Sequence, residues 1–305
     1  MAKILALCTS GRRNGWTHQL FDAACSAAES VSNVQVLRID LQKYEIKPCM
    51  SCFCCIRDPN HKCVKRDTMG KNGELAAEIE SANAILIADP VYLWSATALC
   101  HLFFERMYPN IWSGNLNGMP FASISCASNS GFQYEAAKEI ERHAFHFGLR
   151  FIGSEAVHLS YFKEGMGKCE ELGKKLAEAA LKDAKSREKI TDAEKFAMYN
   201  SPWNVIDSYA ENLTLGTLNA DDMMPAKAIR EGSFERDTAI PLLAAAKEKL
   251  DKFFEAYNAG DYEAACTLMS DGSALWTEAT WREYLERDVI GVSKPSAYRP
   301  VDDIL

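Results

Sequence analysis

Short β-rich runs alternate with longer helical patterns along residues 3–187, and this alternation limits the fold more than any other feature of the sequence. The predicted strands are residues 3–10, 34–41, 84–92, 120–128 and 149–160, and the predicted helices are residues 15–30, 73–82, 95–108, 132–147 and 166–187. The central strands are almost continuously apolar, as expected for parallel strands that are covered on both faces. We therefore predict an α/β fold with a doubly wound, five-stranded parallel sheet in the order 2-1-3-4-5.

The β-to-α loops of such a sheet lie along one edge, because right-handed crossovers return each segment in the same direction. Ligands bind at this edge in open α/β sheets. The loops that follow the predicted strands are therefore the places where a binding site is expected.

The strand–helix alternation ends near residue 188, which divides the chain into residues 1–188 and 189–305. Residues 239–257 carry apolar side chains at helical spacing, and two further helical stretches, YEAACTLM and LWTEATWREYLERDV, follow them. We predict a mainly helical C-terminal extension that packs on the first domain or on a sister subunit.

Composition excludes several classes of protein. A net charge of −8 argues against a nucleic-acid binder, which needs a basic surface. No run of about 18 to 20 uncharged apolar residues exists to span a membrane. The N-terminal residues MAKILALCTS lack the features of a signal peptide, so we expect a cytoplasmic protein. Thiols stay reduced in that compartment, where clustered cysteines more often bind metal or perform redox chemistry than form disulfides.

The loop after the first predicted strand suits a phosphomonoester. It lacks the G-x-G-x-x-G pattern of dinucleotide sites, but it is rich in hydroxyl groups, glycine and arginine just before a helix. Backbone N–H groups at a helix N-terminus, hydroxyl donors and an arginine all favour a phosphate dianion. The candidate residues are Ser10, Arg12, Asn14, Gly15, Trp16 and Thr17. An ordinary polar turn with a helix cap is the alternative.

The loops after the third and fourth predicted strands suit an isoalloxazine ring, which needs a flat apolar slot with polar groups at its edge. The candidates in the earlier loop are Pro90, Val91, Tyr92, Leu93, Trp94 and Ser95, and those in the later loop are Cys126, Ser128 and Gly131. The alternative is that Tyr92 and Trp94 are core residues.

Five cysteines lie within residues 49–63, and four of them, Cys49, Cys52, Cys55 and Cys63, have the spacing C-x2-C-x2-C-x7-C. Disulfides are unfavourable because the compartment is reducing and the close spacing gains little loop entropy. Structural zinc usually pairs two short knuckles across a longer spacer, whereas this spacing is typical of loops that wrap a cubane iron–sulfur cluster. Cys54 is expected to point away. Zinc ligation and free thiols are the alternatives.

Two of these segments resemble the NAD(P)H-dependent FMN reductase group of the flavodoxin-like fold. Residues 10–17 resemble its G-S-x-R-x-x-S/G-x-T loop, and DPVYLWSATALCHLFFER resembles its P-V-Y-x-x-S-x-x-A-x-x-K-x-F-x-D-R segment. The resemblance covers residues 1 to about 180 and implies that FMN is the cofactor. It implies that the first loop holds the phosphate and that residues 90–95 frame the flavin. The chain departs from the group at Thr9, Gly11, Leu93 and Trp94.

The cysteine run, which lies just after the second predicted strand, resembles that of the iron–sulfur flavoproteins. This resemblance implies a [4Fe–4S] cluster bound by Cys49, Cys52, Cys55 and Cys63 beside FMN. The run also resembles a broader set of flavodoxin-like oxidoreductases with a G-C-F-x-C-W-x3-P-G-x-C-x3-D-D-M segment, in which a cluster is not general. Ser51 and Ile56 replace the Gly and Trp of that segment.

The leading functional hypothesis is an FMN enzyme in which the cluster passes electrons from a ferredoxin-like donor to FMN and then to a small-molecule acceptor. Residues 43–66 contain six basic and two acidic residues, a net charge of +4 that would attract an acidic ferredoxin. One alternative is a cluster-free NAD(P)H-dependent FMN or quinone reductase, and another is a non-enzymatic redox carrier or a thiol or metal sensor. The resemblance also implies a homo-oligomer, either a dimer or a tetramer. No catalytic residue is assigned.

Overall fold

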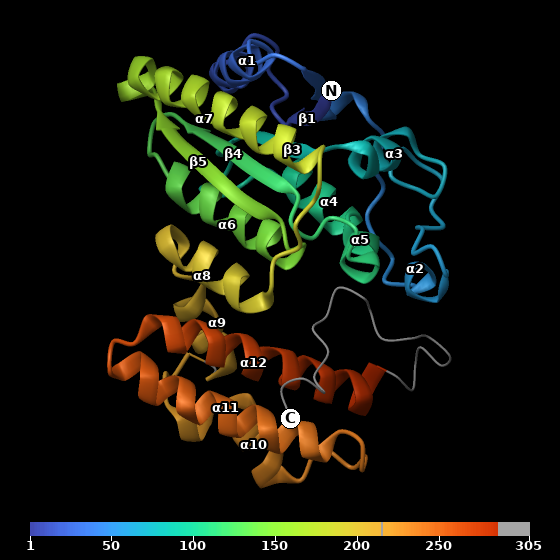
Figure 1. The fold of residues 1–305 in the computed structure, drawn as a ribbon, viewed down its shortest axis with the longest axis vertical. Helices are drawn as coiled ribbons and strands as arrows, with labels where there is room; N and C mark the ends of the chain where they lie inside the picture. The colour runs from blue at the N-terminus through green and yellow to red at the C-terminus, as the bar shows by residue number, and fades with distance from the viewer. Residues whose placement is uncertain (215, 286–305) are drawn as a thin grey trace. The chain divides into compact units, whose positions relative to one another are not determined.

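The computed structural model describes residues 1–214 and 216–285, and Figure 1 shows its elements. The chain divides into two compact units, Met1–Lys189 and Ile190–Leu305.

A five-stranded parallel sheet forms the centre of the first unit. Its strands are β1 (Ala2–Cys8), β2 (Val34–Asp40), β3 (Ala84–Pro90), β4 (Pro120–Ala127) and β5 (Arg150–His158). Their order is β2-β1-β3-β4-β5, and all neighbouring strands are parallel, which confirms the predicted flavodoxin-like topology. Every residue of β3 and β4 is buried, in agreement with their continuous apolar sequences.

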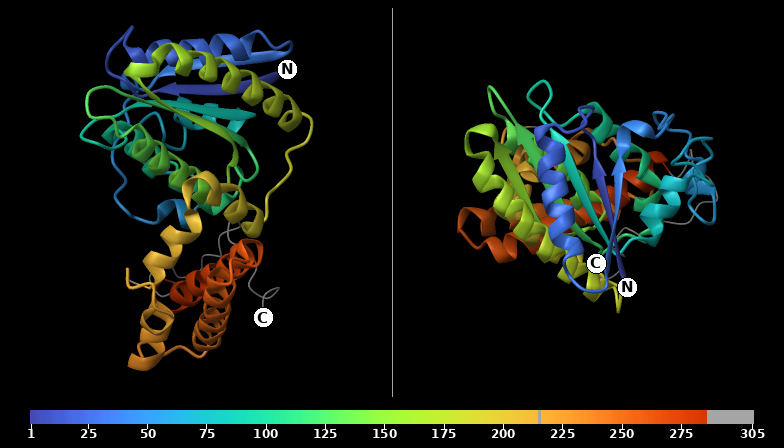
Figure 2. Two further views of the ribbon diagram at one scale, coloured as in Figure 1. Left: turned by 90° about the vertical axis from the view of Figure 1, so that its left-hand side faces the viewer. Right: turned by 90° about the horizontal axis from the view of Figure 1, so that it is seen from above.

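Helices cover both faces of this sheet (Figures 1 and 2). One face carries α1 (Trp16–Glu29) and α7 (Phe162–Asp183), which lie side by side, and the other carries α3 (Glu74–Ser81), α4 (Ala98–Arg106) and α6 (Gln133–His146). The short elements are α2 (Cys54–Arg57), α5 (Tyr108–Ser113), and the 3-10 turns η1 (Leu41–Lys43) and η2 (Leu159–Tyr161). The sequence did not predict α2 and α5, whose four and six residues are too short for a clear helical period.

Helices α1 and α7 approach each other closely at Gly173. A Cβ atom at this position would lie 2.1 Å from the carbonyl oxygen of Ala24 in α1. A side chain here would therefore force the two helices apart. Alternate residues of the sheet, such as Ile4, Leu86 and Ile124, pack into the same apolar cluster.

The described part of the second unit is helical. It contains α8 (Asp192–Trp203), α9 (Val205–Leu213), η3 (Ala220–Asp222), α10 (Met224–Glu231), α11 (Ile240–Asn258), α12 (Tyr262–Thr280) and the π-helical turn η4 (Trp281–Leu285). Helix α11 matches the prediction for residues 239–257. Leu242, Leu243 and Leu275 belong to an apolar cluster formed largely by α11 and α12. The part of the predicted extension from residue 286 to 305 lies outside the described residues.

Helix α8 begins with a capping box. Thr191 accepts a hydrogen bond from the N–H of Glu194, and the Glu194 side chain accepts one from the N–H of Thr191. The pattern T-D-A-E is a readable signal for a helix start.

In residues 1–214 and 216–285, no helix combines the length and the apolar composition that crossing a bilayer requires.

Candidate functional site

The first loop connects β1 to α1 and leaves the start of that helix without a side-chain cap. Gly15 is the N-cap residue, and no side chain accepts a hydrogen bond from the first turn. Ser10 and Thr17 are buried on either side of the loop, while Arg12 is exposed. The uncapped N–H groups, two hydroxyls and a guanidinium form a donor set that fits a phosphate group. These features favour the phosphate interpretation over the ordinary capped turn.

A buried carboxylate ties this first loop to the loop after β3. Asp89 is completely buried at the end of β3, where it accepts hydrogen bonds from the hydroxyl groups of Thr9 and Thr97 and from the Thr97 N–H at 3.0 Å. The Thr97 hydroxyl in turn caps α4 by accepting a hydrogen bond from the N–H of Cys100. Burial raises the pKa of Asp89 to about 6, although these hydrogen bonds oppose the effect.

The second loop turns sharply immediately after β3. Backbone hydrogen bonds join Tyr92 N to Ser95 O at 3.1 Å and Ser95 N to Tyr92 O at 3.2 Å. Leu93 and Trp94 at the tip have φ angles of 49° and 65°, in the left-handed region that side chains other than glycine rarely adopt. Glu139 of α6 supports the turn by accepting hydrogen bonds from the Ser95 hydroxyl at 2.6 Å and from Ala96 N at 2.8 Å.

The aromatic residues of the second loop are exposed. The exposed fractions are 46% for Tyr92, 86% for Leu93 and 61% for Trp94. The alternative that Tyr92 and Trp94 are core residues is therefore wrong. The Trp94 ring lies edge-on to Phe132, at a distance of 6.5 Å between ring centroids.

The third loop follows β4 and leads into α6 through residues of left-handed conformation. Gly131 has a φ angle of 87° and Phe132 one of 70°. Ser128 is exposed, whereas Cys126 is buried within the last residues of β4, and its carbonyl oxygen accepts a hydrogen bond from Val91 N at 2.9 Å. The backbone of the third loop is thus joined directly to the second loop. The residues named for FMN come together at the carboxyl edge of the sheet, and the role of each remains a prediction.

The cysteine segment occupies the crossover between β2 and α3. Cys49, Cys52, Cys55 and Cys63 all line one hollow that is open to solvent. Cys54 does not line it; instead, hydrogen bonding from Cys54 lowers the pKa of the Cys52 thiol. Cys54 is therefore in contact with Cys52 but outside the lining of the hollow, and the ligand set remains a prediction.

Four thiol groups line this hollow, and thiolates are ligands both for zinc and for iron–sulfur clusters. Burial, together with the nearby thiols of Cys63 and Cys49, raises the pKa of the Cys55 thiol to about 12. Among the described residues, no three His, Cys, Asp or Glu side chains are grouped so that they could hold one ion.

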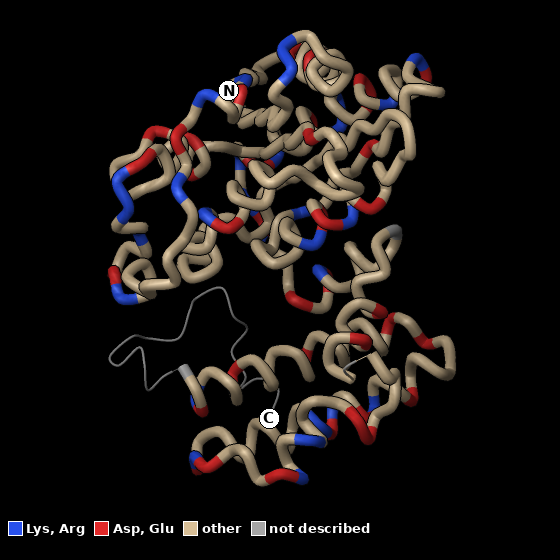
Figure 3. Tube along the Cα trace, turned by 180° about the vertical axis from the view of Figure 1, so that it is seen from behind, with Lys and Arg blue, Asp and Glu red and all other residues tan. Residues whose placement is uncertain are grey.

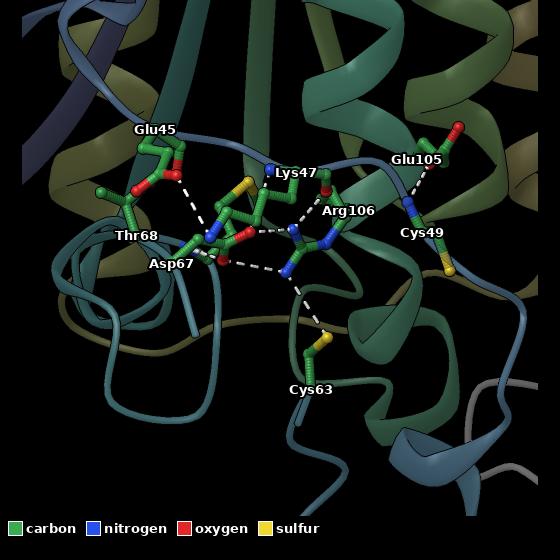
Figure 4. Close-up of polar contacts among 9 residues, drawn as sticks. Glu45, Lys47, Cys49, Cys63, Asp67, Thr68, Glu105 and Arg106 are labelled. Atoms are coloured by element: carbon green, nitrogen blue, oxygen red, sulfur yellow. Dashed lines mark hydrogen bonds and ion pairs between the residues drawn. The ribbon is translucent and has the colours of Figure 1, made fainter. Parts of the chain in front are cut away.

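The last turn of α4 forms another wall of the hollow. Glu105 accepts a hydrogen bond from the backbone N–H of Cys49, and Arg106 forms a buried ion pair with Asp67 (Figure 4). Tyr108 and Pro109 continue the wall.

Comparison with known proteins identifies the family. The sequence model of the NADPH-dependent FMN reductases matches residues 2–164, which is more than half of the chain. This chain belongs to the NADPH-dependent FMN reductase family. It is accordingly an FMN-dependent oxidoreductase.

Individual relatives agree with this assignment. A protein of Archaeoglobus fulgidus named iron-sulfur flavoprotein is 28% identical over 181 residues, which cover 58% of this chain and 80% of that protein. Among solved structures, RosB has a TM-score of 0.48 at 16% identity and covers 65% of this chain and 85% of its own. A flavone reductase has a TM-score of 0.46 at 18% identity, with coverage of 63% and 67%. At these identities the structural likeness concerns the fold alone.

Several residues that organise the site were not identified from the sequence. They are Gln42, whose side chain donates to the carbonyl of Thr9, together with Asp67, Asp89, Thr97, Arg106 and Glu139. Asp89 had a readable signal, because a carboxylate inside the apolar run AILIADP requires partners. Most of the other contacts join positions far apart in the sequence.

Replacing Ser10 and Thr17 by alanine together tests the phosphate loop. We expect FMN affinity to fall by about 2 kcal/mol, or roughly 30-fold in Kd, because hydroxyl donors to a charged phosphate are lost. Fluorescence titration of the apoprotein with FMN measures the change. Ser30→Ala, at the opposite end of α1, is the control and should keep the parental Kd. Parental affinity in the double variant would show that these hydroxyls do not bind the phosphate.

The variant Asp89→Asn tests how the buried carboxyl group changes the free energy of unfolding with pH. Because its pKa is raised, the folded protein binds this proton more tightly than the unfolded chain does. Its contribution to stability is fully present below about pH 4 and is lost as the pH rises through about 6. Relative to the variant, the parent should lose up to about 3 kcal/mol of unfolding free energy between these values.

Urea unfolding of the full chain at pH 4 and pH 7, followed by circular dichroism, measures this difference. Glu170→Gln, which removes an exposed carboxylate on α7, serves as the matched control. If parent and Asp89→Asn changed equally with pH, the carboxyl group would not titrate in this range.

Proposed function

We propose that this FMN-dependent oxidoreductase holds a [4Fe–4S] cluster with Cys49, Cys52, Cys55 and Cys63, and that it takes electrons from a ferredoxin-like protein. The observation that carries the proposal is the shared hollow, which all four of these cysteines line and Cys54 does not. The relative named iron-sulfur flavoprotein supports it. Such a cluster exchanges single electrons and FMN exchanges one or two, so together they would link a one-electron donor to a two-electron small-molecule acceptor.

The residues of the chain have distinct tasks in this proposal. The four thiols would hold the cluster, and the first loop would bind the FMN phosphate. Residues 90–95, 126, 128 and 131 would surround the flavin ring. The exposed aromatic side chains of Tyr92 and Trp94 would cover the ring and limit the access of water.

The ion pairs of the basic residues in 43–66 indicate which of them could form a docking surface for an acidic donor. Figure 3 shows basic and acidic residues interspersed over the first unit. Of the basic residues in 43–66, Lys43 pairs with Asp40 at 3.5 Å and Lys62 pairs with Glu80, so partners outside this segment offset part of its net charge. In the part of the chain that the structure describes, no ion pair is seen for Lys65 or Arg66. These two residues are therefore the strongest candidates to attract an acidic donor.

A cluster-free NAD(P)H-dependent FMN or quinone reductase is the second candidate. The family itself favours it, because the family description names NADPH as the reductant. Anaerobic mixing with NADPH separates the two candidates. Flavin reduction by NADPH at the same rate in the parent and in an iron-free variant would favour this second reaction.

We further propose that the protein works in the cytoplasm as a homo-oligomer, a dimer or a tetramer. All eleven cysteines lie within the described residues as free thiols, and the proposed cluster ligands must stay reduced to bind iron. Sizing chromatography with light scattering of the full chain tests the assembly. A monomeric holoprotein would contradict it.

The first test of the cluster is iron and sulfide analysis after anaerobic purification. We expect about four irons per chain, a broad absorbance beyond the flavin bands, and loss of both in Cys52→Ser with FMN retained. Cys54→Ser is the matched control, since Cys54 is adjacent to the ligands but outside the hollow, and it should keep the iron. Loss of iron in Cys54→Ser alone would mean that the assigned ligand set is wrong.

The ferredoxin donor is tested by stopped-flow reduction. Attraction between exposed charges is screened over about 8–10 Å near physiological salt, so reduction by an acidic ferredoxin should slow as salt rises. Lys65→Glu with Arg66→Glu should slow it roughly tenfold at low salt while reduction by dithionite stays unchanged.

Lys174→Glu with Lys182→Glu introduces the same charge change at exposed positions on α7 and is the control. If both double variants slowed the reaction equally, the effect would be one of net charge, and the proposed docking surface would be incorrect.

A further inference from the structure

Arg106, the last residue of α4, is buried beside the cysteine hollow. Its side chain is 1% exposed, and that of its partner Asp67 is 0% exposed. A buried charge requires a partner and further hydrogen bonds to offset the loss of hydration. The surroundings of this pair supply those hydrogen bonds, and they come from the cysteine segment.

The guanidinium of Arg106 joins three parts of that segment (Figure 4). Both of its amino groups donate to the Asp67 carboxylate, and Nη1 also donates to the carbonyl oxygen of Lys47 at 2.5 Å. The second amino group, Nη2, donates to the sulfur of Cys63 at 3.4 Å. One side chain of α4 therefore reaches a residue before the first cysteine, the last cysteine, and a residue beyond it.

Asp67 completes this arrangement from within the cysteine segment. Its carboxylate accepts hydrogen bonds from Lys47 N at 3.0 Å and from Met69 N at 3.1 Å, in addition to those from Arg106. The two ends of the segment 47–69 are thereby fixed to one another and to α4. The planar guanidinium suits this task because it presents several donors in a fixed fork.

Glu105, which precedes Arg106 in α4, contacts the first cysteine of the proposed ligand set. Glu105 accepts a hydrogen bond from the N–H of Cys49, while Arg106 donates to the sulfur of Cys63. Two consecutive residues thus contact the first and the last cysteine of the motif. The two contacts differ in kind, because only that of Arg106 is made to a sulfur atom.

We propose that Arg106 is a positioning residue for Cys63: it fixes this sulfur at the hollow and, by hydrogen bonding to it, raises the reduction potential of the bound cluster. This inference rests on the proposed function. A hydrogen bond from a cationic donor to a ligating sulfur favours the reduced cluster, which carries one more negative charge. The low exposure of Arg106 shields this interaction from solvent, so its effect is larger than that of a surface charge.

The principal variant is Arg106→Lys, which keeps a positive charge beside Asp67 but lacks the fork that reaches Asp67 and Cys63 together. We expect the variant to retain iron and to have a midpoint potential about 59 mV lower. This corresponds to a tenfold fall in the ratio of reduced to oxidised cluster for a one-electron couple. Anaerobic redox titration of the holoprotein followed by electron paramagnetic resonance measures the potential, independently of activity.

If the lysine variant does not fold, a second variant tests the same effect on the midpoint potential. Asp67→Asn with Arg106→Gln removes both charges together and leaves no unpaired charge buried. Its midpoint potential is also expected to be lower than that of the parent. Lys65→Gln is the matched control, because Lys65 lines the same hollow and loses one positive charge there without a sulfur contact. Its shift should be clearly smaller.

The outcomes separate this inference from the proposed function. A parent protein that binds no iron when prepared anaerobically would overturn both. A parent with iron and a variant with the same potential would overturn the role of Arg106 alone. An equal shift in Lys65→Gln would also overturn it, because the effect would then come from charge in general. Loss of iron from Arg106→Lys with FMN retained would support the positioning of Cys63.

Discussion

The common direction of the five strands determines where this protein can perform chemistry. Because all are parallel, the loops after β1, β2, β3 and β4 leave the sheet at the same edge. The first loop, the second loop with its exposed aromatic residues and the third loop before α6 are three of these connections, and the cysteine segment is the fourth. The candidate FMN site and the cysteine hollow are thus products of one topology, and the helices on the two faces serve mainly to support it.

Two buried aspartates hold these loops, and their different partners give them different properties. Burial affects both, but hydrogen bonds from Arg106 and from the Lys47 N–H keep the pKa of Asp67 below its ordinary value. Asp89 has only hydroxyl and backbone donors, so burial raises its pKa. Asp67 therefore stays ionised as part of an ion pair, whereas Asp89 is a hydrogen-bonding centre with a pKa of about 6. An ion pair therefore holds the cysteine segment, whereas hydrogen bonds from uncharged donors hold the first loop.

The topology and the gathering of four cysteines at one hollow were predictable because both depend on local patterns. Apolar runs and helical periods define the strands, and the spacing of Cys49, Cys52 and Cys55 identifies a shared site. Short helices such as α5 contain too few turns for a helical repeat of apolar residues to be seen in the sequence. The contact of Arg106 with Asp67 joins residues on different elements, and only the folded chain brings them together. The exposure of Trp94 likewise depends on a left-handed turn that its sequence, which lacks glycine at the tip, does not signal.

The close approach of α1 and α7 at Gly173 has a consequence for the order of events during synthesis. Helix α1, whose first turn faces the proposed phosphate site, has its apolar side completed by a helix that emerges from the ribosome much later. Until α7 docks, only α1 can cover this face of the sheet, and the contact at Gly173 that fixes the spacing of the two helices is missing. We therefore expect FMN to bind only after the last helix of the first unit has been synthesised.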